Sequence, residues 1–198
     1  MVTIRPATSA DAQTVAKLLS EAFRDDPAWA MSYSDPATRP KKLEAHYRHR
    51  VRRHPELADV AVDGDQVVGA LLWEAPRSES RPTALLRSAW RVVQRIVSRL
   101  PGARGLAHTL AVEVYRPLEP HWYLHDIAAG PQARGKGVGS ALLTHRLAEI
   151  DASATTLAAL EATSPGSRRL YERFGFEAVG RVPTLPGQAS TVMIRRPD

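Results

Sequence analysis

A glycine-rich segment, Arg134-Gly135-Lys136-Gly137-Val138-Gly139, most constrains what this chain can fold into. It follows an apolar run of strand type, residues 122–129, and opens a helical pattern over residues 137–150. The first N–H groups of a helix have no intrahelical partner, and the aligned peptide dipoles add partial positive charge there. Glycines let a bulky phosphate approach that backbone closely. The segment therefore predicts an anion site, reinforced by Arg134 and Lys136, where a strand leads into a helix.

Two other glycine motifs do not match this segment. A dinucleotide-binding fingerprint needs G-x-G-x-x-G near the start of a doubly wound domain, but Gly137 and Gly139 are followed by Leu142 and few residues remain. A P-loop needs G-x-x-x-x-G-K-[ST], and that string does not occur. A glycine turn with a purely structural role stays open as the alternative.

The residues at the start of the chain predict a strand, two helices and a hairpin. The first helix has Ser9 as its N-cap and ends near Phe23–Arg24, because the residue before Pro27 is pushed out of the α region. The second helix is basic, and its charges are interpreted as a solvated face or as a wall of an acceptor site. An Asp-Gly dipeptide between two apolar runs is a hairpin signal. The expected elements are a strand over residues 2–5, helices over 9–24 and 39–54, and hairpin strands over 58–62 and 67–73.

The remaining residues predict a basic helix followed by alternating strands and helices. Residues 82–100 carry an apolar stripe and an arginine stripe, which indicate an amphipathic helix that covers the core or binds an anionic surface. The stretch 101–105 is expected to break it. The next two strands are parallel, because a crossover helix joins them. These later elements are strands over 122–129, 155–162, 177–181 and 191–195, and helices over 137–150 and 165–174.

Length, cysteine content and charge narrow the class of protein. A chain of 198 residues favours one domain with a buried core. The absence of cysteine excludes disulfides, thiolate nucleophiles and cysteine-bound metals. Neither a signal peptide nor a membrane-spanning run is visible, so a cytoplasmic enzyme is expected. The net charge of +6 leaves nucleic acid, a membrane surface or a polyanionic cofactor as partners.

Two motifs resemble those of the GCN5-related N-acetyltransferases. Residues 131–143 resemble the family's acyl-CoA pyrophosphate motif, [RQ]-x-x-G-x-[GA], with Arg134, Gly137 and Gly139 at its fixed positions. Residues 160–165 and 169–176 resemble its later strand and the helix ending Y-x-[RK]-x-G-F. Within the family, Trp122-Tyr123-Leu124, Leu160-Glu161 and residues 171–176 are most similar to the puromycin N-acetyltransferase branch, which has Asn where this chain has Ser167.

The resemblance implies a fold and a cofactor. The expected fold class is α/β (α+β), a mixed central sheet of six to seven strands flanked by helices. Residues 1–198 would form one domain with a variable acceptor-side insertion at about 76–117. Acetyl-CoA is the implied co-substrate, no metal or nucleic acid is implied, and the protein is expected to be a monomer or homodimer away from membranes. The implied cofactor-binding residues are Ile127, Ala128, Ala129, Arg134, Gly135, Lys136, Gly137, Val138, Gly139, Ser140 and Ser167.

The resemblance also implies direct attack of an amine on the thioester through a tetrahedral oxyanion. His125 is the first choice for the base, because imidazole titrates near neutral pH. Glu161 on the neighbouring strand competes for that role, and a base acting through water stays open. Tyr171 is the expected acid for the leaving thiolate. The backbone N–H of Ala128 is the expected oxyanion donor, at a place where the family strand bulges and splays from its neighbour.

Each of these residues also has a structural interpretation. A single histidine such as His125 is often a satisfied core residue, Glu161 could pair with an arginine, and Tyr171 could simply pack in the core. Gly175 is expected in a left-handed helix cap. The favoured acceptor is the primary amine of a small molecule, such as an antibiotic or aminonucleoside. The alternatives are a protein lysine or N-terminal acetyltransferase, a non-catalytic acyl-CoA-binding protein, and a nucleic-acid-binding module.

Overall fold

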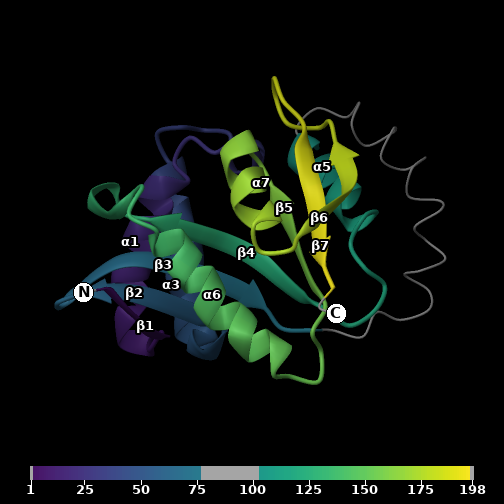
Figure 1. Ribbon diagram of the computed structural model, residues 1–198. Coiled ribbons are helices and arrows are strands. Elements are labelled where there is room, and N and C mark those ends of the chain that lie inside the picture. Colours follow the sequence, from purple (N-terminus) through teal and green to yellow (C-terminus); the bar gives the residue numbers. More distant parts are fainter. Residues whose placement is uncertain (1, 77–102, 197–198) are drawn as a thin grey trace.

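The computed structural model describes residues 2–76 and 103–196, and its centre is a mixed sheet of seven strands. The strand order is β1-β2-β3-β4-β5-β7-β6, and helices cover both faces (Figure 1). The predicted helix over residues 82–100 lies outside the described residues. The strands are β1 Val2–Pro6, β2 Ala58–Asp63, β3 Gln66–Glu74, β4 Trp122–Ala129, β5 Ala158–Ala162, β6 Glu177–Val182 and β7 Ser190–Arg195.

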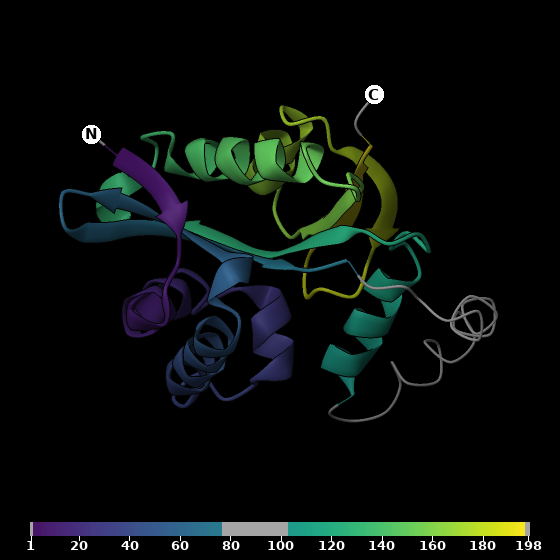
Figure 2. The same cartoon turned by 90° about the horizontal axis from the view of Figure 1, so that it is seen from below.

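The helices divide between the two faces of the sheet. Figure 2 shows α6 and α7 on one face and α1, α2, α3 and α5 on the other. Among the described helices, none is long and apolar enough to cross a membrane. The helices are α1 Ala12–Ala22, α2 Pro27–Ser32, α3 Arg39–Arg53, α5 Arg104–Glu113, α6 Val138–Asp151 and α7 Pro165–Glu172, with short 3-10 turns at Ser9–Asp11, Pro55–Leu57 and Pro131–Ala133.

Two predictions about strand pairing are confirmed. β2 and β3 form the antiparallel hairpin, and Gly64 in its turn has φ of +58°. β4 and β5 are parallel, as the crossover through α6 requires. Local turn chemistry and the strand–helix–strand order were therefore sufficient to predict these neighbours.

The sheet opens in its middle, between β4 and β5. Their pairing covers only Trp122↔Ala158, Tyr123↔Ala159 and Leu124↔Leu160. Beyond Leu124, β4 continues to Ala129 paired with β3 alone. The two strands therefore diverge, and one edge of β4 is left without a strand partner, as the expected splay requires.

Two apolar clusters lie on opposite faces of the sheet. One packs α6 and α7 on the sheet through fully buried residues such as Leu142 and Leu160. The other packs α1 and α3 on the opposite face through Leu19, Leu43 and Tyr47. The sheet therefore separates two apolar cores. The opening between β4 and β5 is a place where the sheet does not close this separation.

Predictions of where elements begin and end were partly wrong. Ser9 is not an N-cap: it begins a 3-10 turn whose preceding residue, Thr8, donates its N–H and hydroxyl to the Asp11 carboxylate at 2.7 and 2.8 Å. β5 begins at Ala158, three residues later than the expected start at Thr155. The prediction for Gly175 is confirmed, since it follows α7 with φ of +78°.

Two short helices were not predicted. The Asp-Pro pair was interpreted only as the end of α1, but Asp26 caps α2 by accepting the N–H groups of Ala28 and Trp29 at 2.9 and 3.2 Å. An acidic cap followed by Pro at the first helical position is a helix start signal, so the information was present. α5 begins at Arg104, inside the stretch expected to break the preceding helix.

Candidate active site

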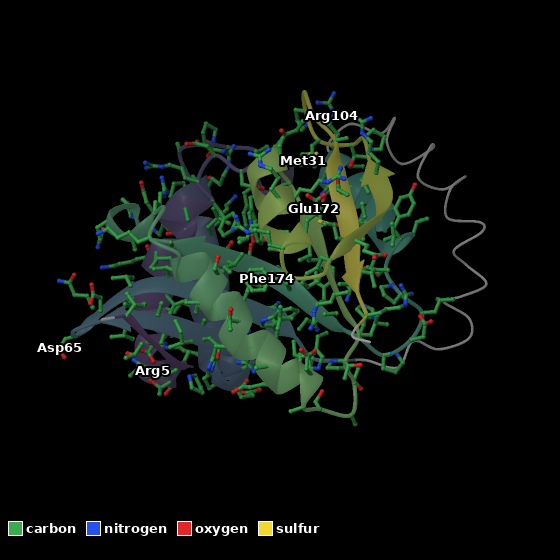
Figure 3. The ribbon with its side chains drawn as sticks, in the orientation of Figure 1. Arg5, Met31, Asp65, Arg104, Glu172 and Phe174 are labelled. Atoms are coloured by element: carbon green, nitrogen blue, oxygen red, sulfur yellow. The ribbon has the colours of Figure 1, made fainter. Side chains whose placement is uncertain are left out.

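A cavity of about 1030 Å³ opens on the face that carries α2 and α5. Its wall combines the end of α1, the helices α2 and α5, the strands β4 and β5, and the start of α7. The helices α2 and α5 meet beside it, because a Cβ built on Gly105 would lie 3.2 Å from the carbonyl oxygen of Met31. Figure 3 labels Met31 and the neighbouring Arg104 at this end of the molecule. Residues 39–54 do not line the cavity, but His46 of this helix lies beside the cavity residue His125, so the interpretation of the basic helix as an acceptor wall stays a prediction.

His125 and Asp126 form a hydrogen-bonded pair in the cavity wall. Consecutive residues of a regular strand point to opposite faces. Leu72 is paired with Asp126 but Trp73 with Leu124, so His125 is an extra residue, a β-bulge in β4. The bulge lets the chain neighbours meet, with 2.6 Å between His125 Nδ1 and Asp126 Oδ2. The expected bulge thus lies at His125, three residues before Ala128.

Aromatic rings surround His125 on the side of α2 and α3. The Trp29 ring lies 6.3 Å from the His125 ring, and the His46 ring lies 6.2 Å from it, between ring centres. Burial lowers the pKa of His46, and the nearby His125 lowers it further. Trp29 was not singled out from the sequence, because no local pattern places it beside β4. His46 belongs to the basic helix over residues 39–54 that was considered as a wall of the acceptor site.

Asp26 is a second carboxylate at this end of the cavity, and it was also missed. Thr163 donates its hydroxyl to Asp26 Oδ2 at 3.3 Å, which ties the start of α2 to the end of β5. Burial raises the pKa of Asp26; the N–H bonds from Trp29 and Ala28 oppose this effect, and the charge of Asp126 adds to it. Asp26 and Asp126 therefore place two interacting carboxylates beside one imidazole.

Glu161 pairs with a histidine instead of the arginine considered from the sequence. His108 Nε2 lies 3.1 Å from Glu161 Oε1, and His108 Nδ1 lies 2.6 Å from Thr184 Oγ1. Glu161 and His125 both line the cavity, from neighbouring strands and with separate partners. The structure thus brings both expected bases to one cavity.

Tyr171 lines the same cavity from α7. Its side chain is buried, with the ring 6.0 Å from that of Phe176. Burial raises the pKa of Tyr171 far above that of a free phenol, and the charge of Asp126 adds to the effect. The hydroxyl therefore keeps its proton at neutral pH and is able to donate it.

The glycine-rich segment leaves backbone N–H groups open at the start of α6. Gly135 and Gly137 have φ of +74° and +79°, and a Cβ built on either would meet no atom within 4 Å. Gly137 is the N-cap of α6, and no side chain caps this helix. Within the described residues, the N–H groups of Val138, Gly139 and Ser140 have no hydrogen-bond partner. These groups fit a polyanion, with Arg134 at the cavity edge beside them.

The backbone direction of β4 differs from the expectation for Ala128. Gly130 donates its N–H to Val68 of β3 at 2.8 Å. Because N–H direction alternates along a strand, Ala128, which is paired with Ala70, also points its N–H to β3. The N–H groups of Ile127 and Ala129 point to the other edge, from which β5 has diverged. Ala128 is therefore not placed to donate into the opening, and Ile127 is.

Ser167 lines the cavity, but its hydroxyl has local partners. It donates to the carbonyl of Ser164 at 2.9 Å and accepts the Ser164 N–H at 3.2 Å. The Ser164 hydroxyl in turn accepts the N–H of Ser167 at 3.1 Å. These bonds form the capping box of α7. Ser167 therefore fixes the start of the helix that carries Tyr171.

The sign of the charge in the cavity is opposite to that of the chain. Among the described residues of its wall, seven are carboxylates and three are arginines, while the whole chain carries +6. The carboxylates would still outnumber the cations if both cavity histidines, His108 and His125, were protonated. A cavity of this charge attracts cations. The carboxylates are Glu21, Asp25, Asp26, Glu74, Glu113, Asp126 and Glu161.

Comparisons with known proteins identify a family whose members share this fold. Residues 15–176 match the model of the acetyltransferase (GNAT) family. A crystal structure described as histone acetyltransferase HPA2 and related acetyltransferase from Corynebacterium glutamicum is 30% identical, with 100% of this chain and 97% of that chain covered and a TM-score of 0.68.

Two more distant structures share the fold. A polyamine N-acetyltransferase from Drosophila melanogaster is 17% identical, with 100% of both chains covered and a TM-score of 0.68. A mosquito arylalkylamine N-acetyltransferase like 5b is also 17% identical, with 98% of this chain and 99% of that chain covered and a TM-score of 0.70.

Proposed function

This chain belongs to the acetyltransferase (GNAT) family and is an acyltransferase, and from that premise we propose that it acetylates the primary amine of a small molecule with acetyl-CoA. One observation carries the proposal: the opening between β4 and β5 lies between the uncapped start of α6 and a cavity lined with carboxylates. An anionic thioester carrier and a cationic acceptor can therefore approach one point from opposite sides of the sheet.

The cavity favours a small cationic acceptor. Its volume of about 1030 Å³ is at the upper end of the range for small-molecule sites, which is roughly 300–1,000 Å³. Its carboxylates favour an ammonium group. The fold relatives named above act on polyamines and arylalkylamines. Residues 122–124, 160–161 and 171–176 resemble those of puromycin N-acetyltransferases, which supports a place in that branch.

Binding of acetyl-CoA is assigned to the backbone of two elements. The free N–H groups of Val138, Gly139 and Ser140 bind the pyrophosphate, and Arg134 adds positive charge. The N–H of Ala129 binds the pantetheine arm along the open edge of β4, and the N–H of Ile127 is left for the reacting carbonyl. Acetyl-CoA supplies the activated acyl group. The N–H of Ile127 stabilises the developing oxyanion, in place of Ala128.

Proton transfer is assigned to His125 and Tyr171, with two carboxylates in support. Asp26 and Asp126 draw the ammonium group to His125, which takes its proton. Asp126 holds the ring at 2.6 Å and stabilises the imidazolium that forms. Tyr171, kept protonated by burial, donates to the leaving thiolate. One N–C bond forms and one C–S bond breaks. The first ammonium proton, taken by His125, returns to solvent, and the second proton that the nitrogen loses as the intermediate collapses replaces the one that Tyr171 gave to the thiolate.

Calorimetry and a thiol-release assay test the proposal together. We expect acetyl-CoA to bind in the micromolar range, and CoA to be released only when an amine is added. The amine panel contains puromycin, arylalkylamines, diamines and lysine peptides. Turnover with peptides alone would instead support a protein acetyltransferase, which the name of the Corynebacterium relative makes the second candidate. Acetyl-CoA binding without turnover of any amine would indicate a non-catalytic member.

The role of His125 is tested by its pH profile. In His125→Gln the acidic limb of kcat/KM against pH should move or disappear, because the titrating imidazole is gone. The matched control is His49→Gln, an exposed histidine of α3 outside the cavity wall. If the pH profile of His125→Gln is the same as that of the wild type, the role of general base would be assigned to Glu161.

A further inference from the structure

His108 joins three parts of the chain that are distant in sequence. It lies in α5, faces Glu161 of β5 and contacts Thr184 in the loop between β6 and β7. Its side chain is 7% exposed and that of Glu161 is 13% exposed. Nε2 faces Glu161 and Nδ1 contacts Thr184, so both ring nitrogens have partners and the orientation of the ring is fixed. A buried imidazole with two hydrogen bonds fixes the carboxylate that it contacts.

Glu161 faces the cavity from the opposite side of the strand opening to Asp126. It follows Leu160, which belongs to the core on the other face, and its side chain lines the cavity wall. Tyr123 of β4 pairs with Ala159, two residues before Glu161. Burial raises the pKa of Tyr123, and the charge of Glu161 adds to the effect. The guanidinium carbon of Arg116 lies 4.0 Å from the centre of the Tyr123 ring. Arg116 pairs with Glu113, with 2.8 Å between Nη1 and Oε1.

The carboxylate of Glu161 keeps the capacity to bind a ligand. An ionised carboxylate has about four acceptor positions, and an imidazole occupies one or two of them. Within the described residues, His108 is the only basic side chain within hydrogen-bond distance of the Glu161 carboxylate. Glu161 lines a cavity whose other carboxylates repel an anion. A cationic donor is therefore the group that fits.

We propose that Glu161, oriented by His108, is a second recognition point that binds a cationic group of the acceptor remote from the reacting amine. The inference rests on the proposed function and names its substrate class: a dication, such as a diamine. Asp26 and Asp126 hold the reacting end beside His125, and Glu161 holds the far end. His108 is a positioning residue, because it acts only through Glu161.

Calorimetry with matched amines tests this without turnover. The probes are pentylamine and its diamine counterpart cadaverine, titrated into protein saturated with CoA. We expect cadaverine to bind about tenfold tighter, because a charge-assisted hydrogen bond supports a difference of that order. Glu161→Gln should reduce this ratio to near one. His108→Ala should reduce it too, and His108→Gln, which keeps a donor toward Glu161, should restore part of it.

A matched control separates this effect from loss of any histidine pair. His145 faces Glu149 at 3.6 Å on α6, outside the cavity wall, and His145→Gln should keep the wild-type ratio. Equal affinity of the wild type for both amines overturns the proposal. Equal weakening of both amines in Glu161→Gln also overturns it, because Glu161 would then serve the reacting amine. If His108→Ala fails to bind CoA, the amine affinities of Glu161→Gln and His108→Gln still test the proposal.

The outcome is independent of whether the protein is an enzyme. A cadaverine preference that Glu161→Gln abolishes supports the second recognition point even when no CoA is released. Loss of turnover with an intact preference would count against the proposed function alone. Where turnover is measurable, the Glu161 effect should lie in KM for cadaverine more than in kcat.

Discussion

Tyr171 is the residue whose role depends least on the identity of the acceptor. Its buried hydroxyl keeps its proton, and it lies where α7 meets the strand opening. Tyr171→Phe should lower kcat by about a hundredfold, the lower range for a general acid. Acetyl-CoA affinity by calorimetry should not change. Tyr115→Phe, whose ring packs over Gly180 away from the cavity, is the control. Equal kcat in both variants would leave Tyr171 a packing residue.

Asp26 predicts how amine binding depends on pH. Its raised pKa means that it gains a proton at a higher pH than an ordinary carboxylate, whose value is about 3.9. As the pH falls through that raised value, the wild type should lose attraction for the ammonium and its KM should rise.

The comparison with Asp26→Asn isolates this effect. The variant should have a KM about tenfold higher near neutral pH, as expected for one lost charged contact, and a flatter KM profile. Wild-type and variant KM values should converge in acid. Asp65→Asn, in the exposed turn between β2 and β3 (Figure 3), should follow the wild type. Parallel profiles for the wild type and Asp26→Asn would remove Asp26 from the binding site.

The start of α6 is tested as an element by comparing two glycines. Gly137 and Gly64 both have positive φ, and both have free space around a built Cβ. Alanine at either position should cost about 1 kcal/mol of folding free energy, because the left-handed conformation is strained for a residue with Cβ. Only Gly137→Ala should weaken the binding of acetyl-CoA, with a Kd about tenfold higher. Equal acetyl-CoA affinity in the two variants would place the pyrophosphate elsewhere.

The bulge in β4 is the other element that determines the site. One extra residue at His125 changes the face to which the following side chains point and brings His125 to Asp126. The same strand presents the N–H groups of Ile127 and Ala129 to the opening. A single strand thus supplies the imidazole, its carboxylate partner and the backbone donors.

At the scale of the whole molecule, a buried ion pair joins α6 to the sheet. Arg146 donates from Nε and Nη2 to the two oxygens of Asp59 at 2.7 and 2.8 Å, and Asp59 is fully buried. Arg146→Met should cost about 3–5 kcal/mol in the free energy of unfolding, because it leaves a buried carboxylate unpaired.

The double variant is the control for that prediction. Arg146→Met with Asp59→Leu should recover most of the loss in urea unfolding, since neither charge then remains buried. A cost below about 1 kcal/mol for the single variant would mean that water reaches Asp59 and the pair does not hold α6 in place.

The sequence alone determined the features that depend on short stretches of backbone. The hairpin at Gly64, the left-handed cap at Gly175 and the glycine-rich start of α6 all follow from local φ preferences and unpaired N–H groups. The order of the elements also made β4 and β5 parallel. These predictions needed no knowledge of distant contacts.

Only the tertiary structure decided which side chains meet in the cavity. Asp26 meets Thr163, and His108 meets Glu161 and Thr184, through contacts between elements far apart in sequence. The direction of the Ala128 N–H was likewise not readable, because a shift of one residue in strand register reverses it. Local propensity sets the elements, but register, a bulge and packing set the chemistry.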